Sequence, residues 1–388
     1  MPEKIKLIIQ AIGGYGAGFV MTADNMEDEY EIVTAIDPYA KDSPAFDEFE
    51  DKAVFDTLEE FFAAGHTADA LVCSSPIQFH ADHFTQALEK GLHVLCEKPL
   101  CASDQEARQM LESAQKYPEL VNLIGFQWSF SPAILKAKKQ IIDGLWGAPI
   151  SLKAIVRWPR GYSYYARNDW AGKLKDSKGA FVCDSVLSNA TAHYLHNPLF
   201  MLGDSLEKSA MPSNIEAETY KAFDIETFDT AFVDLDVPNH NSLDTKVFVV
   251  VSHSCEGTDD PIIEYNFEKG KMWRTKDDRL VGELEGQSVD FGIIGSNFEG
   301  YYNKLKHFYD CIKKTQEPVC TAQTAYPVFK TTDYILNEIP TKSFRADLIE
   351  EVPMGANDKR LAVKGLDALM QESFDKMILP QKLGRDFT

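Results

Sequence analysis

The chain has 388 residues, 44% of them apolar, so it is long enough to bury a large core and to form two domains. Its 60 acidic residues outnumber its 39 basic ones, and the formal charge of -21 disfavours nucleic acid and anionic membrane surfaces as partners. No segment approaches the roughly 20 apolar residues that span a bilayer. The 7 cysteines lack C-x-x-C spacing, which predicts reduced thiols in a cytoplasmic protein.

Short apolar runs alternate with helical patterns over the first 126 residues, which is typical of a parallel sheet with crossover helices. One predicted helix ends at Gly91, and another begins where Ser103 and Glu106 have capping-box spacing. Strands are predicted at residues 5–12, 31–37, 70–75, 93–97 and 120–126.

The pattern changes from about residue 150. Alternating or β-branched stretches with few helices between them predict a large, open, mostly antiparallel sheet. Helices are expected between Pro132 and Gly144, near 303–314 and near 325–339. The expected organisation is thus an α/β chain with an N-terminal domain at 1–126, a second α/β domain at 127–340, and a C-terminal helical extension at 341–388. Within that extension, the amphipathic segment 359–377 predicts a helix that docks on this chain or on a partner subunit.

A glycine loop, AIGGYG, follows the first strand and fits G-x-G-x-x-G with alanine in the first place. Such a loop lets a pyrophosphate approach the backbone at a helix N-terminus, although a plain glycine turn has the same letters. We expect Ala11 to keep a negative φ. Asp37 ends the second strand 21 residues after Gly16, where a carboxylate binds the ribose hydroxyls of NAD and repels the extra phosphate of NADP. An aspartate before Pro38 also fits a simple turn.

The most specific segment is SSPIQFHADHFTQALEKGLHVLCEKPL, residues 74–100. It resembles the Gfo/Idh/MocA oxidoreductases, whose pattern is T/S-P-x-x-x-H, a helix, and then G-x-H-V-x-x-E-K-P. With the glycine loop and the later GFQWSFSPA and WAGK segments, the resemblance covers about residues 5–340. It implies a Rossmann domain for NAD(P) and a second domain that carries the substrate face and often the oligomer interface, here of a homodimer or homotetramer.

The resemblance also implies roles for single residues. It places Lys98 at the junction of nicotinamide and substrate, where an ammonium can stabilise a developing alkoxide, and it implies a cis peptide before Pro99. His80 fits a polar cap or packing role equally well, and His93 is expected to be structural. The expected cofactor-binding residues are Ile12, Gly13, Gly14, Tyr15, Gly16, Asp37, Ser74, Ser75, Pro76, His80, Glu97, Lys98 and Gln127.

Aromatic and basic residues gather in RWPRGYSYYARNDWAGK, residues 157–173. Sugar rings offer apolar C–H faces and hydroxyls, so aromatic walls with a few fixed donors suit them. An interface loop has a similar composition. We favour the substrate interpretation for Arg157, Tyr164, Tyr165 and Trp170.

The proton-transfer group departs from the family pattern, in which an aspartate and a histidine stand one helical turn apart. Asp184 matches the aspartate, but Ser188 occupies the histidine position, and a serine hydroxyl cannot replace an imidazole as a base. Asn189 and His193, spaced i, i+4, share a helix face. On a straight helix His193 and Asp184 point in opposite directions, so both reach one site only if the helix begins after Asp184 or bends.

The predicted catalytic residues are therefore Lys98, His193, Asp184 and Asn189, with His193 favoured as the base. His196 is expected to be a structural neighbour, because H-x-x-H supplies only two ligands; no metal is predicted. These features predict an NAD-dependent oxidoreductase that acts on a secondary alcohol of a sugar, polyol or glycoside. Two alternatives use the same parts: an enzyme that cleaves glycosides through transient oxidation and regenerates NAD, and a non-catalytic dinucleotide sensor.

Overall fold

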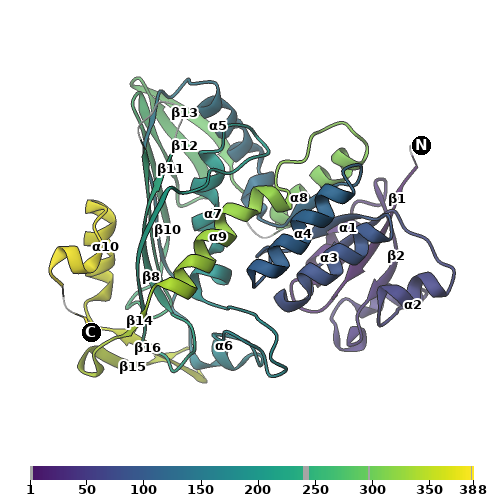
Figure 1. Ribbon diagram of the computed structural model, residues 1–388, viewed down its shortest axis with the longest axis horizontal. Helices are drawn as coiled ribbons and strands as arrows, with labels where there is room; N and C mark the ends of the chain where they lie inside the picture. The colour runs from purple at the N-terminus through teal and green to yellow at the C-terminus, as the bar shows by residue number, and fades with distance from the viewer. Residues whose placement is uncertain (1–2, 239–243, 296–297, 386) are drawn as a thin grey trace. The chain divides into compact units, whose positions relative to one another are not determined.

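The protein is described by a computed structural model that covers residues 3–238, 244–295, 298–385 and 387–388. It forms two compact units (Figure 1). The first comprises Met1–Ser131 with Gly295–Tyr326, and the second comprises Pro132–Ile294 with Pro327–Thr388. Each unit contains its own sheet, in agreement with the predicted α/β class.

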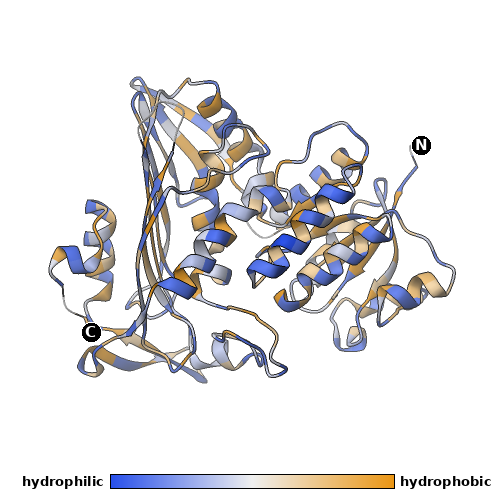
Figure 2. Ribbon diagram, in the orientation of Figure 1, coloured by the Kyte–Doolittle hydropathy of each residue, from blue (hydrophilic) through white to orange (hydrophobic). Residues whose placement is uncertain are grey.

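The first unit is built on a five-stranded parallel sheet with the order β2-β1-β3-β4-β5. All four residues of β3 are apolar and buried, because helices cover both faces of such a sheet. Figure 2 shows these strands in orange and α4 with blue turns. The five predicted strands are present; β2 is shifted by one residue and the others are shorter than predicted: β1 (Ile5–Gln10), β2 (Tyr30–Ile36), β3 (Ala70–Cys73), β4 (His93–Cys96) and β5 (Asn122–Ile124).

The strand order reverses at β1, because β2 pairs on one side of it and β3 on the other. In open α/β sheets ligands bind at the carboxyl ends of the strands at such a reversal. The helices of this unit are α1 (Gly16–Asp24), α2 (Leu58–Ala63), α3 (His80–Glu89), α4 (Asp104–Lys116) and α8 (Phe298–Ile312), with 3-10 turns at Ala40–Asp42, Phe46–Phe49, Ile77–Phe79 and Gln127–Phe130.

Helix α8 packs with the first unit, although residues 295–326 were expected in the second domain. The Tyr30 hydroxyl donates to the carbonyl of Leu305 at 2.7 Å, and the amide of Ile124 donates to the carbonyl of Cys320 at 2.7 Å. The chain therefore leaves this unit and returns to it. A continuous domain boundary cannot describe such a path.

The second unit is built on a nine-stranded sheet with the order β13-β12-β11-β10-β6-β9-β8-β7-β14. Neighbouring strands are antiparallel except in the pairs β6–β9 and β7–β14, which agrees with the expected mostly antiparallel sheet. The strands are β6 (Pro149–Arg157), β7 (Asn214–Lys221), β8 (Thr230–Val237), β9 (Thr245–Ser252), β10 (Asp259–Phe267), β11 (Gly270–Arg274), β12 (Arg279–Leu284), β13 (Gln287–Ile293) and β14 (Thr341–Ser343).

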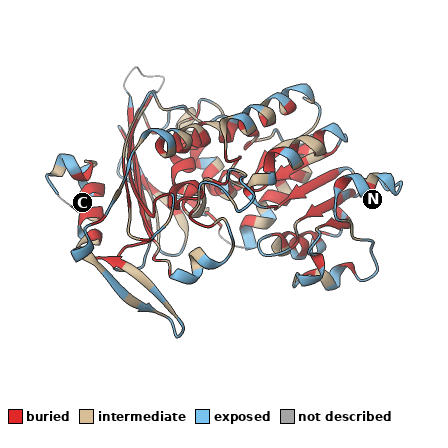
Figure 3. Cartoon of the chain, turned by 60° about the horizontal axis from the view of Figure 1, so that its bottom comes forward, coloured by how far each residue is buried: buried red, intermediate tan, exposed pale blue. Residues whose placement is uncertain are grey.

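Helices cover both faces of this sheet (Figure 1). Helix α10 packs Leu369 and Phe374 against Phe232 and Phe248 on one face, and α5 and α7 contact the other. The strands are accordingly mostly red in Figure 3. The helices are α5 (Pro132–Ile142), α6 (Tyr162–Ala166), α7 (Ala192–Met201), α9 (Ala322–Glu338) and α10 (Leu366–Lys376), with a π-helical turn at Val186–Ala190 and 3-10 turns at Ala346–Leu348 and Pro380–Leu383.

The C-terminal extension is less helical than expected. Within the predicted helix 359–377, only Leu366–Lys376 is an α-helix. The preceding residues form β16 (Asp358–Val363), which pairs antiparallel with β15 (Ile349–Met354). Gly365, at φ 78°, separates the strand from the helix. The backbone hydrogen bonds of this hairpin outweigh the helical spacing of its apolar residues.

Two kinds of feature are absent from the described residues. No helix there is long and apolar enough to cross a membrane. No group of three or more His, Cys, Asp or Glu side chains is placed there to hold a metal ion.

Candidate nucleotide and substrate sites

The glycine loop connects β1 to α1, and its shape depends on a contact across the turn. A Cβ on Gly16 would lie 1.9 Å from the carbonyl oxygen of Ala11, so only glycine fits there. A Cβ on Gly13 or Gly14 would have no neighbour within 4 Å, so the other side of the loop is open. Open backbone before the first turn of α1 fits a pyrophosphate.

Ala11 has φ 62°, which contradicts the expected negative value. The tight turn requires the left-handed conformation there, and a Cβ makes that conformation costly. We predict that Ala11→Gly stabilises the protein by about 1 kcal/mol in urea unfolding. Ala17→Gly, in the right-handed helix α1, is the control and is expected to lower stability by about 0.5–1 kcal/mol. A loss of stability in Ala11→Gly would contradict this account.

Asp37 lies beside the glycine loop. Its carboxylate accepts hydrogen bonds from the amide of Ile12 at 2.9 Å and from the amide of Tyr39 at 2.8 Å. Asp37 therefore caps a turn, which was the simpler interpretation of an aspartate before Pro38, and its carboxylate also lies next to the glycine loop. A ribose hydroxyl could use its remaining lone pairs.

The loop after β3 holds Ser74, Ser75 and Pro76, of which Ser75 is buried. The Ser75 hydroxyl lies 2.9 Å from Nδ1 of His83, so it points inward. His80 is 2% exposed, and its ring nitrogens lie 2.8 Å from the carbonyl oxygen of Pro99 and 2.9 Å from that of Ser75. The structure therefore favours the packing interpretation for His80, which ties the loop after β3 to the loop after β4.

The E-K-P segment follows β4. Glu97 is 6% exposed, Lys98 is half-buried, and the Lys98–Pro99 peptide is cis, as the resemblance implied. The strands β3 and β4 are parallel neighbours, with Cys73 opposite Cys96. Lys98 and Ser74 therefore emerge at the same edge of the sheet.

A buried ion pair joins this segment to α8. Nζ of Lys304, which is fully buried, pairs with Glu97 and also donates to the Tyr15 hydroxyl at 3.1 Å. Burial lowers the pKa of Lys304, and the Glu97 charge opposes that shift. Burial, reinforced by the Glu97 charge, raises the pKa of Tyr15 far above its usual value, so its hydroxyl stays protonated.

The same cluster holds the glycine loop. The Tyr301 hydroxyl donates to the carbonyl of Tyr15 at 3.0 Å, and the Tyr15 hydroxyl donates to Oε1 of Gln127 at 3.3 Å. Of the predicted cofactor residues, Tyr15, Glu97 and Gln127 thus meet around Lys304. Neither Lys304 nor Tyr301 was predicted, because a lysine and a tyrosine in an amphipathic helix carry no signal of their own.

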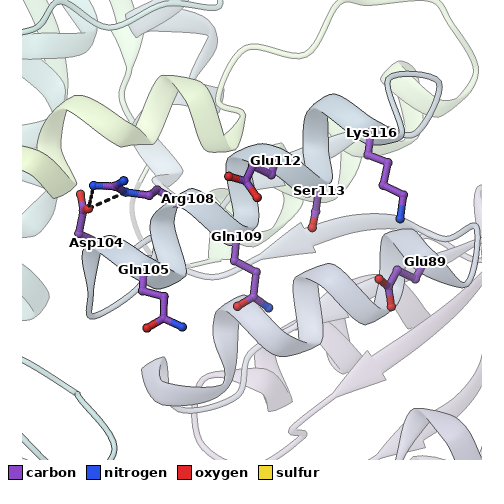
Figure 4. A pocket seen from close by; sticks show the side chains of 8 residues that line it. All are labelled: Glu89, Asp104, Gln105, Arg108, Gln109, Glu112, Ser113 and Lys116. Atoms are coloured by element: carbon purple, nitrogen blue, oxygen red, sulfur yellow. Dashed lines mark hydrogen bonds and ion pairs between the residues drawn. The ribbon is translucent and has the colours of Figure 1, made fainter.

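A polar groove lies along α4, beside α3 (Figure 4). Gln109 reaches from α4 to Asp82 and Thr85 on α3, at 3.1 and 3.2 Å. The lining includes no predicted site residue: Glu89, Asp104, Gln105, Arg108, Gln109, Glu112, Ser113 and Lys116. This groove is therefore separate from the residues of the candidate nucleotide site.

In the second unit, the helix after Asp184 both begins late and bends. Ser185 is the N-cap of the π-helical turn Val186–Ala190, and Ser188 completes a capping box with it. Thr191 then separates this turn from α7. Ser188, at the histidine position of the family pattern, is thus a capping residue, and the helix begins after Asp184, which is one of the two alternatives that would let Asp184 and His193 reach one site.

Asp184 is buried and already bound. Its oxygens accept from Nδ2 of Asn189 at 2.7 Å and from the amide of Gly172 at 2.8 Å, and Arg167 lies 3.9 Å away. Asn189 and His193 are partly exposed. His196 is 1% exposed, and burial together with the Lys138 charge lowers its pKa to about 3. His193 is therefore the more accessible base, and His196 is structural.

The predicted substrate residues separate into two groups. Arg157 is 7% exposed and bound by Asp259 and Gln371, at 2.6 and 2.8 Å. Gln371 belongs to α10, on the face of the sheet opposite α7, so Arg157 does not belong with Asp184, which corrects that prediction. Tyr164 and Trp170 surround Arg167 instead, with ring centres 3.7 and 5.2 Å from its guanidinium carbon.

Tyr165 extends this group to a residue that was not predicted. Its hydroxyl lies 3.1 Å from Nδ1 of His253, which follows β9 and is 1% exposed. Trp158 packs edge-on against Tyr194 of α7, which adjoins His193. The segment 158–170, Asp184 and the start of α7 thus form one continuous cluster in the second unit.

Comparison with known proteins agrees with this geometry. Residues 8–123 match an oxidoreductase family with an NAD-binding Rossmann fold, GFO_IDH_MocA. An inositol 2-dehydrogenase of Corynebacterium glutamicum is 28% identical over 166 residues, 42% of this chain and 49% of that protein. A scyllo-inositol 2-dehydrogenase (NAD(+)) of Bacillus subtilis is 24% identical over 280 residues, 65% of this chain and 70% of that protein.

The likeness of fold extends over both units. An oxidoreductase from Thermotoga maritima superposes with a TM-score of 0.67 at 22% identity, over 86% of this chain and 96% of that one. In sequence, the chain spans about half the length of the Corynebacterium dehydrogenase, with 49% of it matched. Residues 8–123, which include the glycine loop and the E-K-P segment, thus match the Gfo/Idh/MocA family of oxidoreductases, and the first unit is an NAD-binding Rossmann domain.

Proposed function

We propose that the protein is an NAD-dependent dehydrogenase that acts on a secondary alcohol of a sugar, polyol or glycoside. The observation that carries the proposal is the E-K-P segment at the carboxyl edge of the first sheet, where Lys98 follows β4 and the open glycine loop follows β1 of the same parallel sheet. The inositol dehydrogenases to which the chain is similar support the alcohol class.

NAD would be held by the glycine loop, by Asp37 and by the backbone of the Ser74–Pro76 loop. When bound, NAD supplies a hydride acceptor. Asp37 favours NAD over NADP, because its carboxylate next to Ile12 would repel a 2′-phosphate. Lys98, in this proposal, stabilises the negative charge that develops on the substrate oxygen.

We propose that His193 takes the hydroxyl proton. A neutral imidazole can accept a proton at physiological pH, which suits this role. Asp184 would instead orient Asn189, since it already accepts from Asn189 and Gly172. Tyr164, Tyr165 and Trp170 would form the wall against the sugar ring.

His193→Ala is expected to lower kcat by about 100-fold, the usual contribution of a general base. Asp184→Asn, which keeps a side chain of the same shape, is expected to lower kcat less than His193→Ala does. Initial rates at saturating NAD measure both. If Asp184→Asn loses more activity than His193→Ala, then Asp184 is the proton acceptor and our assignment is wrong.

The proposed activity is tested with a panel of inositols, sugars and glycosides, each incubated with NAD or NADP while reduced cofactor is followed by absorbance. Stoichiometric NADH formation is expected. Cleavage of a glycoside without net NADH would favour transient oxidation. Binding of NAD without turnover of any compound would favour the sensor. Light scattering of the purified protein tests the expected homodimer or homotetramer.

A further inference from the structure

The cluster in the second unit contains a guanidinium without a counterion. Arg160 is partly buried, and its Nε is buried without a hydrogen-bond partner among the described residues. Its guanidinium carbon lies 5.1 Å from the ring centre of Tyr164 and 5.9 Å from that of Trp158. Aromatic faces stabilise a cation only weakly, and an oxyanion ligand would supply the charged partner that the described residues do not give Arg160.

A second guanidinium lies in the same cluster. The guanidinium carbon of Arg167 lies 3.7 Å from the ring centre of Tyr164, and Arg167 forms a long ion pair with Asp184 at 3.9 Å. That carboxylate is already bound by Asn189 and Gly172. Asp229, a further nearby carboxylate, accepts from the amides of Ala222 and Phe223. Both carboxylates thus accept hydrogen bonds from other donors, and neither forms an ion pair with Arg160 among the described residues.

His253 adds a buried polar atom to this group. The amide of Arg160 donates to the carbonyl of His253 at 3.0 Å, so the two residues adjoin. Nε2 of His253 has no hydrogen-bond partner among the described residues. Burial, and then the charges of Arg160 and Arg167, hold the pKa of His253 well below its usual value, so the ring is neutral. Nδ1 lies 3.1 Å from the Tyr165 hydroxyl, so Nε2 is the ring nitrogen that can serve a ligand, as donor or as acceptor according to the tautomer.

We propose that the substrate is a sugar with an anionic group, a carboxylate or a phosphate, that pairs with Arg160 and Arg167. This inference rests on the proposed dehydrogenase function and narrows its substrate class. Guanidinium groups bind both anions through paired N–H donors, so the shared chemistry is a planar or tetrahedral oxyanion. A neutral inositol would leave Arg160 uncompensated.

The test compares neutral and acidic sugars of the same ring: glucose against glucuronate for a carboxylate, and glucose against glucose 6-phosphate for a phosphate. Wild-type kcat/KM is expected to be at least about tenfold higher for one acidic sugar, the size of one charge-assisted contact. Which acid is preferred identifies the anion. Equal or better turnover of glucose would overturn the inference while leaving the dehydrogenase function intact.

Variants locate the contact. Arg160→Met is expected to lower the acid-to-neutral ratio of kcat/KM by roughly 10- to 100-fold, and Arg160→Lys to recover part of it. Arg345→Met removes an exposed arginine paired with Asp347 and is the matched control, with an unchanged ratio. An unchanged ratio in Arg160→Met would contradict the proposal. A rise in the KM for NAD that is equal with both sugars in Arg160→Met would also contradict the proposal, because Arg160 would then bind the cofactor phosphates.

If no compound of the panel reduces NAD, the proposed function fails and the inference is tested by binding alone. Titration calorimetry of glucose, glucuronate and glucose 6-phosphate into the NADH-loaded protein is then expected to detect an acidic sugar only. That binding is expected to be lost in Arg160→Met. Absence of acid-selective binding in the wild-type protein would overturn the inference as well.

Discussion

Lys98→Met is expected to lower kcat by about 100- to 1000-fold, the cost of removing one donor that stabilises a developing oxyanion. Methionine keeps most of the length and apolar stem of lysine, and Lys98 is only half-buried, so the fold is expected to remain. Single-turnover NADH formation with the substrate found in the panel measures the chemical step.

Lys116→Met is the matched control for this variant. Lys116 ends α4 in the groove of Figure 4, apart from the E-K-P segment, and its removal is expected to leave kcat unchanged. Lys98→Arg retains the charge but has a larger, planar head, so partial activity is expected. Wild-type kcat in Lys98→Met would show that the chemistry does not use the lysine of E-K-P.

The second large effect concerns the buried pair of Glu97 and Lys304. Lys304→Met is expected to destabilise the protein by about 3–5 kcal/mol, because it leaves the Glu97 charge buried without its partner. Urea unfolding followed by tryptophan fluorescence measures the loss. The affinity for NAD is also expected to fall, since Lys304 contacts Tyr15 of the glycine loop.

The double variant Glu97→Gln/Lys304→Met separates stability from positioning. It removes both charges, so most of the stability is expected to return, while the contact with Tyr15 remains lost and the KM for NAD stays raised. Lys306→Met is the control on the same helix; its pair with Asp310 is partly exposed, and about 1 kcal/mol or less is expected. A double variant as unstable as Lys304→Met would contradict the charge-pair account.

Local sequence predicted the parts of the site whose chemistry is contained in one short segment. The apolar run of β3, the glycine loop and the E-K-P segment each combine a strand with the loop that follows it, so their letters alone indicate a ligand edge. The helix boundaries at Gly91 and Ser103 were also predicted from a few contiguous residues. The structure has α3 end at Glu89 and α4 begin after Ser103, because capping depends on neighbours within four residues.

Packing between distant segments decided the rest. Ala11 adopts φ 62° because the tight turn of the loop requires it, against its own preference. Ser188 stands where the family pattern has a histidine, and it completes the cap of the π-helical turn Val186–Ala190. This turn places Asn189 next to Asp184. No spacing rule along the chain contains that turn.

Arg157 and Arg160 show the same limit most plainly. The two arginines are three residues apart in one aromatic and basic segment, so the sequence gives no reason to separate them. Arg157 is the last residue of β6 and is bound by Gln371 of α10. Arg160 instead lies beside Tyr164 and His253. Similarly, Lys304 became part of the nucleotide site only because α8 returns to the first unit. The sequence by itself determined the match to an NAD-binding Rossmann fold, the glycine loop and the E-K-P segment, because those depend on contiguous residues. The tertiary structure alone decided which charges are paired, because a counterion comes from any segment that folding brings near.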